Sequence, residues 1–145
     1  MIRRPPRSTL LDIRRQRQMC IRDRNNGYLT NDLMDAVAEY LDMPAIAVYE
    51  VATFYSMYEL EPVGKHKICL CTNISCMLCG SDNIVEHLTQ KLGIKMGQTT
   101  PDGRFTLKEV ECLGACVEAP MFQIGDIYYG NLTADKIDKI LEELD

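Results

Sequence analysis

Two segments decide the fold and chemistry of this chain: ICLCTNISCMLCG at positions 68–80 and ECLGAC at positions 111–116. Together they contain six of the seven cysteines. Four of these thiols form the patterns Cys71-x4-Cys76 and Cys112-x3-Cys116. Each pair sits where an apolar run gives way to small and polar residues, as happens in loops at strand ends. Four thiolates carried by such loops suit an iron–sulfur cluster or zinc, and we interpret the set as the site of a [2Fe–2S] cluster.

Two other interpretations of the cysteines remain open. Cys76 and Cys79 form a C-x-x-C motif at the start of a helix that follows a strand, as in a thioredoxin-like dithiol oxidoreductase. That interpretation leaves Cys71, Cys112 and Cys116 unexplained, so we rank it second. A structural zinc site could use any four thiols. However, zinc knuckles typically stabilise small domains without a core, and this chain has enough apolar residues to build one.

The composition bounds the class of protein. The chain has 145 residues, of which 46% are hydrophobic, and this suits one soluble domain with a short appendage. Seven cysteines crowded into a few loops are unlike a secreted disulfide framework, so a reducing compartment is the better expectation. No apolar run is long enough to cross a bilayer, and any membrane contact is therefore expected to be indirect.

The formal charge of −5 conceals two oppositely charged parts. Residues 1–24 hold eight of the 16 Lys and Arg residues and two of the 21 acids. The remaining residues therefore carry 16 − 8 = 8 bases and 21 − 2 = 19 acids, a net charge of −11. This acidity argues against binding nucleic acid, which requires clustered positive charge. It favours a basic protein surface as the partner.

Residues 1–24 do not resemble the rest of the chain. Their arginine-rich, acid-poor composition fits an organellar transit peptide or a basic tail for an anionic surface. The strings MIRRPPRSTL and RRQRQMCIRDR, however, resemble translated sequencing-adapter read-through. We favour this third interpretation and expect a non-native or disordered extension, in which Cys20 has no function.

From residue 25 onwards the sequence predicts two helices. The first begins at Thr30, a suitable N-cap, and ends before Pro44. The second spans residues 44–55 and is apolar on nearly all sides. We expect it to be a buried helix, and the alternative is that one of its sides is a partner interface.

The following residues predict an α/β domain. We expect a strand at 66–71, a helix at 74–92 closed by Gly93, a strand at 104–110 and a hairpin at 121–129. Thr133 should cap a last helix, in which Ile137, Ile140 and Leu141 form the buried stripe. A right-handed crossover through the 74–92 helix should make the first two strands parallel.

Other catalytic signals are weak. There is no G-x-G-x-x-G sequence and no P-loop, so the chain has no evident nucleotide site. His66 and His87 lack neighbouring cysteines or acids in the sequence, and we expect both to be solvated.

Several segments together resemble a known family. The sequence EVATFYSM at 50–57, the pattern Cys71-x4-Cys76, and ECLGAC followed by Ala119-Pro120 are similar to the 24-kDa-type [2Fe–2S] subunit of respiratory complex I. In bacteria this family is called the E-subunit of NADH-quinone oxidoreductase. The resemblance covers residues 25–145. It implies a helical segment at 25–60 and a thioredoxin-like [2Fe–2S] ferredoxin domain at 61–145. It also implies the ligand set Cys71, Cys76, Cys112 and Cys116, without Cys69 or Cys79.

The resemblance further implies an electron-transfer role inside a larger oxidoreductase. The chain would carry one [2Fe–2S] cluster beside the flavoprotein subunit that binds FMN and NADH, among other peripheral-arm subunits. We therefore expect a cytoplasmic location at the inner face of a bacterial plasma membrane, rather than the mitochondrial matrix. The isolated chain should not turn over NADH. Similar subunits serve NAD-linked hydrogenases and formate dehydrogenases, which remain alternatives. Family members usually begin with a further helix where residues 1–24 stand here, so we expect that the native start is lost.

Overall fold

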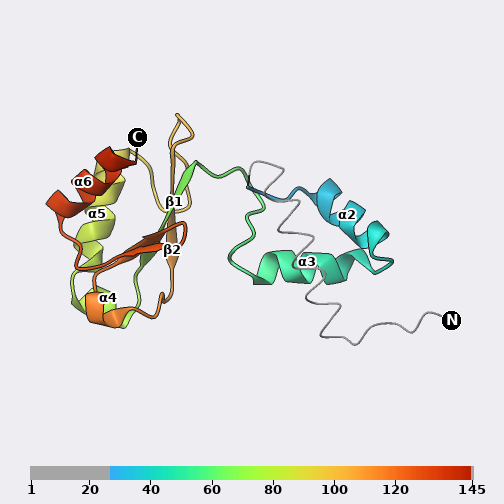
Figure 1. The fold of residues 1–145 in the computed structure, drawn as a ribbon, viewed down its shortest axis with the longest axis horizontal. Helices are drawn as coiled ribbons and strands as arrows, with labels where there is room; N and C mark the ends of the chain where they lie inside the picture. Colours follow the sequence, from blue (N-terminus) through green and yellow to red (C-terminus); the bar gives the residue numbers. More distant parts are fainter. Residues whose placement is uncertain (1–26, 145) are drawn as a thin grey trace. The chain divides into compact units, whose positions relative to one another are not determined.

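The computed structural model describes residues 27–144, which fall into two compact units that meet at the Val63–Gly64 bond (Figure 1). The N-terminal unit is helical, and the C-terminal unit combines a sheet with helices. Within the described residues, no helix is long and apolar enough to cross a membrane.

The N-terminal unit contains the two helices that the sequence predicts. Helix α2 spans Asn31–Tyr40, and the Thr30 side chain caps it by accepting a hydrogen bond of 3.3 Å from the Leu33 N–H. Helix α3 spans Ala45–Phe54 and follows Pro44. The two helices pack through a small core that also includes the flanking residues; its buried members are Leu29, Met34, Val37, Ala38, Val48, Val51, Ala52 and Tyr58.

The prediction that α3 is buried on all sides is wrong. Val48 and Val51 face the core of this unit, but Ile46 and Phe54 are 67% and 80% exposed. The reason is that a helix packed mainly against one neighbour buries one stripe, whatever the character of its other side. Helix α3 therefore presents apolar side chains to solvent in the described part of the chain.

The C-terminal unit is built on a four-stranded sheet in the order β2-β1-β3-β4. Strand β1 spans His66–Cys71 and pairs in parallel with β2, Phe105–Val110, as the sequence predicts. Strands β3, Phe122–Ile124, and β4, Ile127–Tyr129, form the expected hairpin, and β3 runs antiparallel to β1. The predicted α/β fold class is therefore present in this unit.

The connection between β1 and β2 differs from the prediction. The single helix expected at 74–92 is two helices, α4 at Ile74–Leu78 and α5 at Ser81–Leu92. The break occurs at Gly80, whose φ of +89° is left-handed and cannot continue a right-handed helix. Gly93 closes α5 as predicted, with a φ of +67° and an N–H that donates to the Thr89 carbonyl at 3.0 Å.

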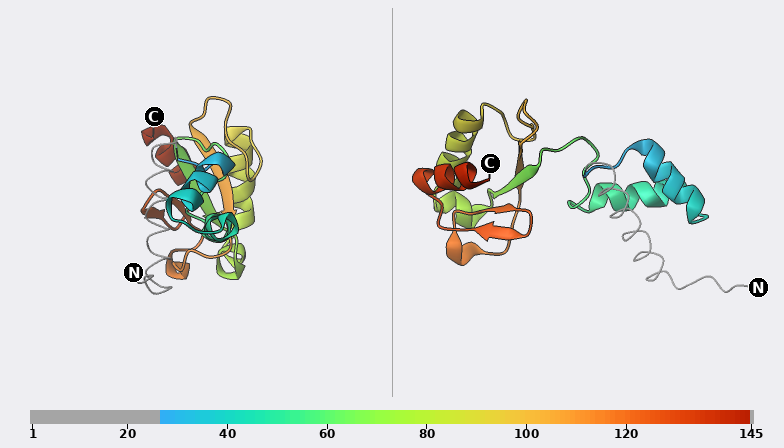
Figure 2. Two further views of the ribbon diagram at one scale, coloured as in Figure 1. Left: turned by 90° about the vertical axis from the view of Figure 1, so that its right-hand side faces the viewer. Right: turned by 45° about the horizontal axis from the view of Figure 1, so that its top comes forward.

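One core holds the sheet and its helices together. Helix α5 and the last helix, α6 at Ala134–Glu143, both cover the same face of the sheet (Figures 1 and 2). Alternate residues of the strands, including Ile68, Leu70 and Leu107, point into this core, as the pleat of a strand requires. From α6 the core receives the predicted stripe Ile137, Ile140 and Leu141.

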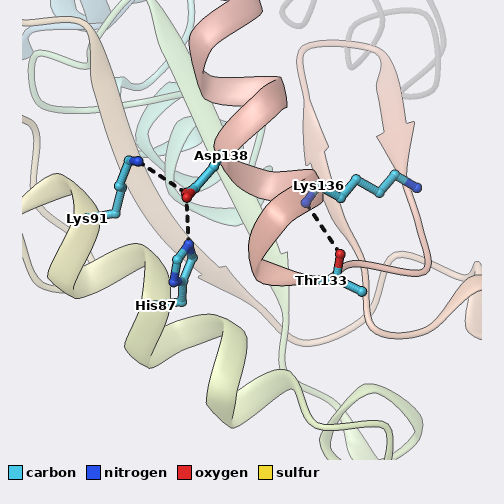
Figure 3. Close-up of polar contacts among 5 residues, drawn as sticks. All are labelled: His87, Lys91, Thr133, Lys136 and Asp138. Atoms are coloured by element: carbon cyan, nitrogen blue, oxygen red, sulfur yellow. Dashed lines mark hydrogen bonds and ion pairs between the residues drawn. The ribbon is translucent and has the colours of Figure 1, made fainter.

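Helix α6 is attached by polar contacts as well (Figure 3). Thr133 accepts a hydrogen bond of 3.3 Å from the Lys136 N–H, which is the predicted N-cap. The Asp138 Oδ1 atom lies 2.9 Å from His87 Nε2 and 3.3 Å from Lys91 Nζ, and both of these side chains come from α5. The prediction that His87 is simply solvated is therefore wrong. Its partner lies 51 positions away in the sequence, so no local spacing could indicate the pair.

Candidate metal centre

The candidate metal centre lies where the parallel strands β1 and β2 end. Cys71 is the last residue of β1 and is paired in register with Val110, the last residue of β2. The ladder continues for one more bond, from the Thr72 N–H to the Val110 carbonyl at 3.2 Å. Cys112 follows two residues after Val110. Because parallel strands end at the same end of a sheet, the loops carrying Cys71 and Cys112 leave the sheet side by side.

Helix α4 directs Cys76 towards the interior. The Asn73 side chain accepts a hydrogen bond of 2.7 Å from the Ile74 N–H and so fixes the start of this short helix. Cys71 and Cys76 are both buried, and they form a small apolar cluster with Met121. Partly buried residues of the neighbouring loop complete this cluster, namely Leu113, Ala115 and Ala119.

The Cys76 thiol is the most strongly perturbed group at this end of the sheet. Its pKa is raised to about 11, first because a thiolate loses solvation on burial, and then by the neighbouring Cys71 thiol, with a smaller effect from Cys116. The Cys71 thiol itself donates a weak hydrogen bond to the Glu111 carbonyl at 3.8 Å. The Met121 N–H donates to the Cys76 sulfur and acts in the opposite direction. The pKa of Cys76 thus responds to two of the other predicted ligands, Cys71 and Cys116.

The loop after β2 carries Cys112 and Cys116, and both are exposed. Gly114 has a φ of +74°, and its N–H points to the Cys112 sulfur at 3.4 Å. Cys116 begins a 3₁₀ turn, η1, at Cys116–Glu118. A residue later in the chain stabilises this turn, since the Asn131 N–H donates a hydrogen bond to the Glu118 carbonyl at 2.6 Å. At the neighbouring strand, the Cys71 N–H donates to the Met121 carbonyl at 3.2 Å.

The donor chemistry of the four thiols can be compared with what a cluster requires. Among residues 27–144, no three His, Cys, Asp or Glu side chains converge on a point that would hold one metal ion. A [2Fe–2S] cluster needs only two thiolates on each iron, supplied by loops around it. The four predicted ligands provide that donor set: Cys71 and Cys76 from inside, and Cys112 and Cys116 from the exposed loop. The donor chemistry therefore fits a [2Fe–2S] cluster.

Comparison with known proteins gives the family of this chain. The family model described as thioredoxin-like [2Fe–2S] ferredoxin matches residues 6–145, which include part of the arginine-rich segment. The chain belongs to the thioredoxin-like [2Fe–2S] ferredoxin family. The predicted fold class is thereby confirmed, and membership implies a [2Fe–2S] cluster.

Relatives within the ferredoxin family are close in sequence. NADH-quinone oxidoreductase E-subunit 2 of Rhizobium meliloti is 48% identical over 124 residues, which are 86% of this chain and 74% of the relative. The NADH-quinone oxidoreductase E-subunit of Rickettsia conorii is 52% identical over 120 residues, which are 83% of this chain and 72% of the relative. The resemblance to the E-subunit that the sequence predicts is confirmed.

A solved structure supports the fold of this ferredoxin-family chain. The crystal structure of an NAD⁺-reducing [NiFe]-hydrogenase in the air-oxidized state matches with a TM-score of 0.68 at 22% sequence identity. The match covers 78% of this chain but only 20% of the hydrogenase chain. At this identity the likeness concerns the fold alone.

The remaining described cysteines of this ferredoxin-family chain lie in other surroundings. Cys69 is half-buried within β1, two residues before Cys71, and Cys79 is exposed at the C-terminal cap of α4. None of the six cysteines that the structure describes forms a disulfide bond. Cys20 lies outside the described residues.

Sequence reasoning did not identify the backbone donors individually. The N–H groups of Met121 and Gly114 both point to sulfur atoms, at Cys76 and Cys112 respectively. The glycine between two cysteines was a usable signal, since small residues let the backbone approach sulfur. Met121 had no such signal, because its contact depends on the pairing of β3 with β1.

Proposed function

We propose that this chain transfers single electrons through one [2Fe–2S] cluster bound by Cys71, Cys76, Cys112 and Cys116, as a component of an NADH-quinone oxidoreductase. The observation that carries the proposal is the packing of Cys71 and Cys76 in one buried cluster, at the end of the sheet where the loop carrying Cys112 and Cys116 also emerges. Identity of about 50% to proteins named as the E-subunit of that complex supports the assignment.

Each part of the site has a distinct role in this function. When bound, the cluster supplies a one-electron redox centre. The buried side chains of Cys71, Cys76 and Met121 exclude water from its inner side. The N–H groups of Met121 and Gly114 stabilise negative charge on sulfur, which raises a reduction potential.

Acidic residues affect the reduction potential of the cluster in the opposite direction to these N–H groups. Glu109, Glu111 and Glu118 are exposed in and next to the loop that carries Cys112 and Cys116. Their charges disfavour addition of an electron. We therefore propose a low-potential cluster.

The proposed partners are the FMN- and NADH-binding flavoprotein subunit and other peripheral-arm subunits. The charge of the N-terminal unit supports a protein partner with basic character. Residues 27–63 contain seven acids and no lysine or arginine; the acids are Asp32, Asp35, Glu39, Asp42, Glu50, Glu59 and Glu61. Through these partners the chain would be peripheral to the cytoplasmic face of a bacterial plasma membrane.

The alternatives have less support. A thioredoxin-like dithiol oxidoreductase needs an exposed thiol with a low pKa, whereas Cys76 is buried and its pKa is raised. An equivalent subunit in an NAD-linked hydrogenase or formate dehydrogenase would use the same site. The hydrogenase match, at 22% identity, bears only on the fold.

Anaerobic reconstitution of the full chain with iron and sulfide tests the proposal. The expected result is the visible absorption and, after reduction, the EPR signal of one [2Fe–2S] cluster. The isolated chain should oxidise no NADH, because we propose that FMN and NADH bind to its partner. A colourless protein that holds one zinc, or one that reduces disulfides through Cys76 and Cys79, would contradict the proposal.

A further inference from the structure

Thr72 connects the two cysteine-bearing loops at the end of the sheet. Its hydroxyl donates a hydrogen bond of 2.7 Å to Glu109 Oε1, and its N–H donates to the Val110 carbonyl at 3.2 Å. Both acceptors belong to β2, which leads directly into the loop that carries Cys112. Thr72 itself follows Cys71, the last residue of β1. The side-chain contact between Thr72 and Glu109 is named the clasp.

The clasp has favourable geometry and chemistry for a contact near the surface. The register pairs Leu70 with Glu109, and Thr72 lies two residues beyond Leu70, so the two side chains are diagonal neighbours across the parallel strands. A hydroxyl that donates to a carboxylate forms a charge-assisted bond, which is shorter and stronger than a bond between neutral groups. Because the Thr72 side chain is half-buried and β-branched, it loses little conformational freedom when this bond forms.

The clasp fixes the first residue of the loop between Cys71 and Cys76. The next residue, Asn73, caps α4 by accepting a hydrogen bond of 2.7 Å from the Ile74 N–H. The chain is therefore held at Thr72 and again at Asn73 before it reaches Cys76. A displacement of Thr72 would move Cys71 on one side and the start of α4 on the other. The positions of both thiols thus depend on the clasp.

Another contact between the same two loops depends on a proton that a metal ligand must lose. The Cys71 thiol donates its weak hydrogen bond to the Glu111 carbonyl. A cysteine binds iron as the thiolate, so this bond cannot persist when Cys71 is a ligand. The clasp involves no ligand atom and does not depend on that proton. Its share in holding the two loops together therefore increases when a cluster is bound.

We propose that Thr72 is a positioning residue for the cluster and acts through Glu109. The inference rests on the proposed function, in which Cys71, Cys76 and Cys112 are ligands. The clasp keeps the loop of Cys71 and Cys76 at a fixed distance from the strand that leads to Cys112. It also holds the Glu109 carboxylate against the residue next to a ligand. A negative charge fixed there lowers the reduction potential of the cluster.

Two double-mutant cycles in the full chain test this role. The first combines Thr72→Val, which removes the hydroxyl but keeps the branched shape, with Glu109→Ala, which removes its acceptor. The control cycle combines Thr72→Val with Glu111→Ala, because Glu111 is also an exposed acid but is not the acceptor of the Thr72 hydroxyl. Thr72→Ser keeps a hydroxyl and is the rescue variant. After anaerobic reconstitution, the rate of cluster loss to an iron chelator and the reduction potential are measured for each protein.

Thr72→Val and Glu109→Ala should each speed cluster loss about threefold to tenfold, since each removes the same hydrogen bond. The double variant should lose its cluster no faster than the faster single variant, whereas the effects of Thr72→Val and Glu111→Ala should multiply. Thr72→Val should also raise the reduction potential, but by less than Glu109→Ala does, because the released carboxylate stays charged and is screened by solvent. Thr72→Ser should match the wild type in both measurements.

Three results would overturn the positioning role. These are wild-type cluster loss and potential in Thr72→Val, effects of Thr72→Val and Glu109→Ala that multiply, and a Thr72→Ser chain that behaves like Thr72→Val. A Thr72→Val chain that takes up no cluster, while Thr72→Ser does, would support the role.

A wild-type chain that takes up no cluster would contradict the proposed function instead. Amide hydrogen exchange in the cluster-free chain then decides whether the clasp holds the loop. The amides to follow are those of Ile74 and Met77, whose N–H groups are bonded to Asn73. Their exchange should be faster in Thr72→Val than in the wild type and unchanged in Thr72→Ser. Equal exchange in all three proteins would overturn the clasp.

Discussion

Cys76 and Cys79 are only three residues apart, yet their surroundings differ. Cys76 is buried and interacts with Cys71 and Cys116, whereas Cys79 is exposed at the helix cap. A cluster ligand must reach the other thiols, and Cys76 packs in one buried cluster with Cys71, a cluster that Cys79 does not join. This shared packing with Cys71 separates the proposed ligand from its nearest competitor.

Single substitutions to serine should separate the ligands from the other cysteines. Serine at Cys71, Cys76, Cys112 or Cys116 should abolish or strongly alter the visible and EPR spectra of the reconstituted chain, because serine is a poor substitute for thiolate. Serine at Cys69 or Cys79 serves as the matched control and should leave the spectra unchanged. Loss of the spectrum in Cys79→Ser together with its retention in Cys76→Ser would reverse the assignment.

Asp138 should make the stability of the C-terminal unit depend on pH. Its hydrogen bond from His87, followed by the effect of Lys91, lowers the pKa of this carboxyl below its ordinary value of 3.8. A lowered pKa means that the folded state binds the proton less well than the unfolded state does. The resulting stabilisation is present above the unfolded pKa and is lost as pH falls through the folded value.

Urea unfolding of Asp138→Asn measures this contribution. The variant should be less stable than the wild type at pH 7, and the difference should shrink as the pH falls below about 4. Glu142→Gln, which changes an exposed carboxyl in the same helix, should show no comparable trend. A constant difference between Asp138→Asn and the wild type from pH 7 to pH 3 would refute the role of this contact.

At the residue scale, the sequence predicted the cysteine patterns, which depend on local spacing. It missed the contacts between residues that are far apart in the chain. The pairs Cys71-x4-Cys76 and Cys112-x3-Cys116 were visible because their members are close in the chain. The contact of His87 with Asp138 joins two helices and had no local pattern. The same holds for the Met121 N–H at Cys76, which depends on strand pairing.

At the scale of elements, the bounds of most helices and strands followed from capping residues and alternation. Strand β1 at His66–Cys71 begins and ends at the predicted residues, and Thr30 and Thr133 cap the predicted helices. The break between α4 and α5 was missed because Gly80 was not assigned a left-handed conformation. A single glycine within a helical pattern is often tolerated, so the sequence alone does not decide such a break.

The exposed side of α3 gives a test at this scale. Phe54→Ser should change the free energy of unfolding by less than about 0.5 kcal/mol, because the side chain is exposed. Met34→Ala, which removes a fully buried side chain in the same unit, should cost about 2–5 kcal/mol. Denaturant unfolding of both variants checks the contrast. A cost for Phe54→Ser close to that of Met34→Ala would mean that α3 is buried on both sides after all.

At the scale of the whole molecule, the described residues form two units with separate cores. The predicted boundary between residues 60 and 61 is close to the junction at Val63–Gly64, but independent folding is still a prediction. The proposed origin of residues 1–24 lies outside the described residues. Their foreign character remains a prediction, and burial of Leu10, Leu11 and Ile13 in a core would contradict it.

A chain of residues 61–145 should fold alone. Its core is drawn entirely from the C-terminal unit, and the start of that unit is anchored there, since the Gly64 N–H donates to Thr106 Oγ1 at 2.6 Å. We expect the circular dichroism of a mixed α/β protein and uptake of the cluster with the spectrum of the full chain. An unfolded fragment, or one that unfolds without cooperativity, would show that the N-terminal unit is required.

The turn that carries Cys116 has a consequence for the order of biosynthesis. All four proposed ligands have left the ribosome once translation has passed well beyond residue 116, but η1 and the residues that directly follow it are held in place by residues that are made later. Among these contacts are the bond of 2.6 Å from Asn131 to Glu118 and the bond of 3.0 Å from Leu132 to Pro120. Iron insertion is therefore expected after translation has finished. A chain terminated at Tyr129 retains every proposed ligand and should nevertheless fail to keep its cluster, which gel filtration after reconstitution would reveal.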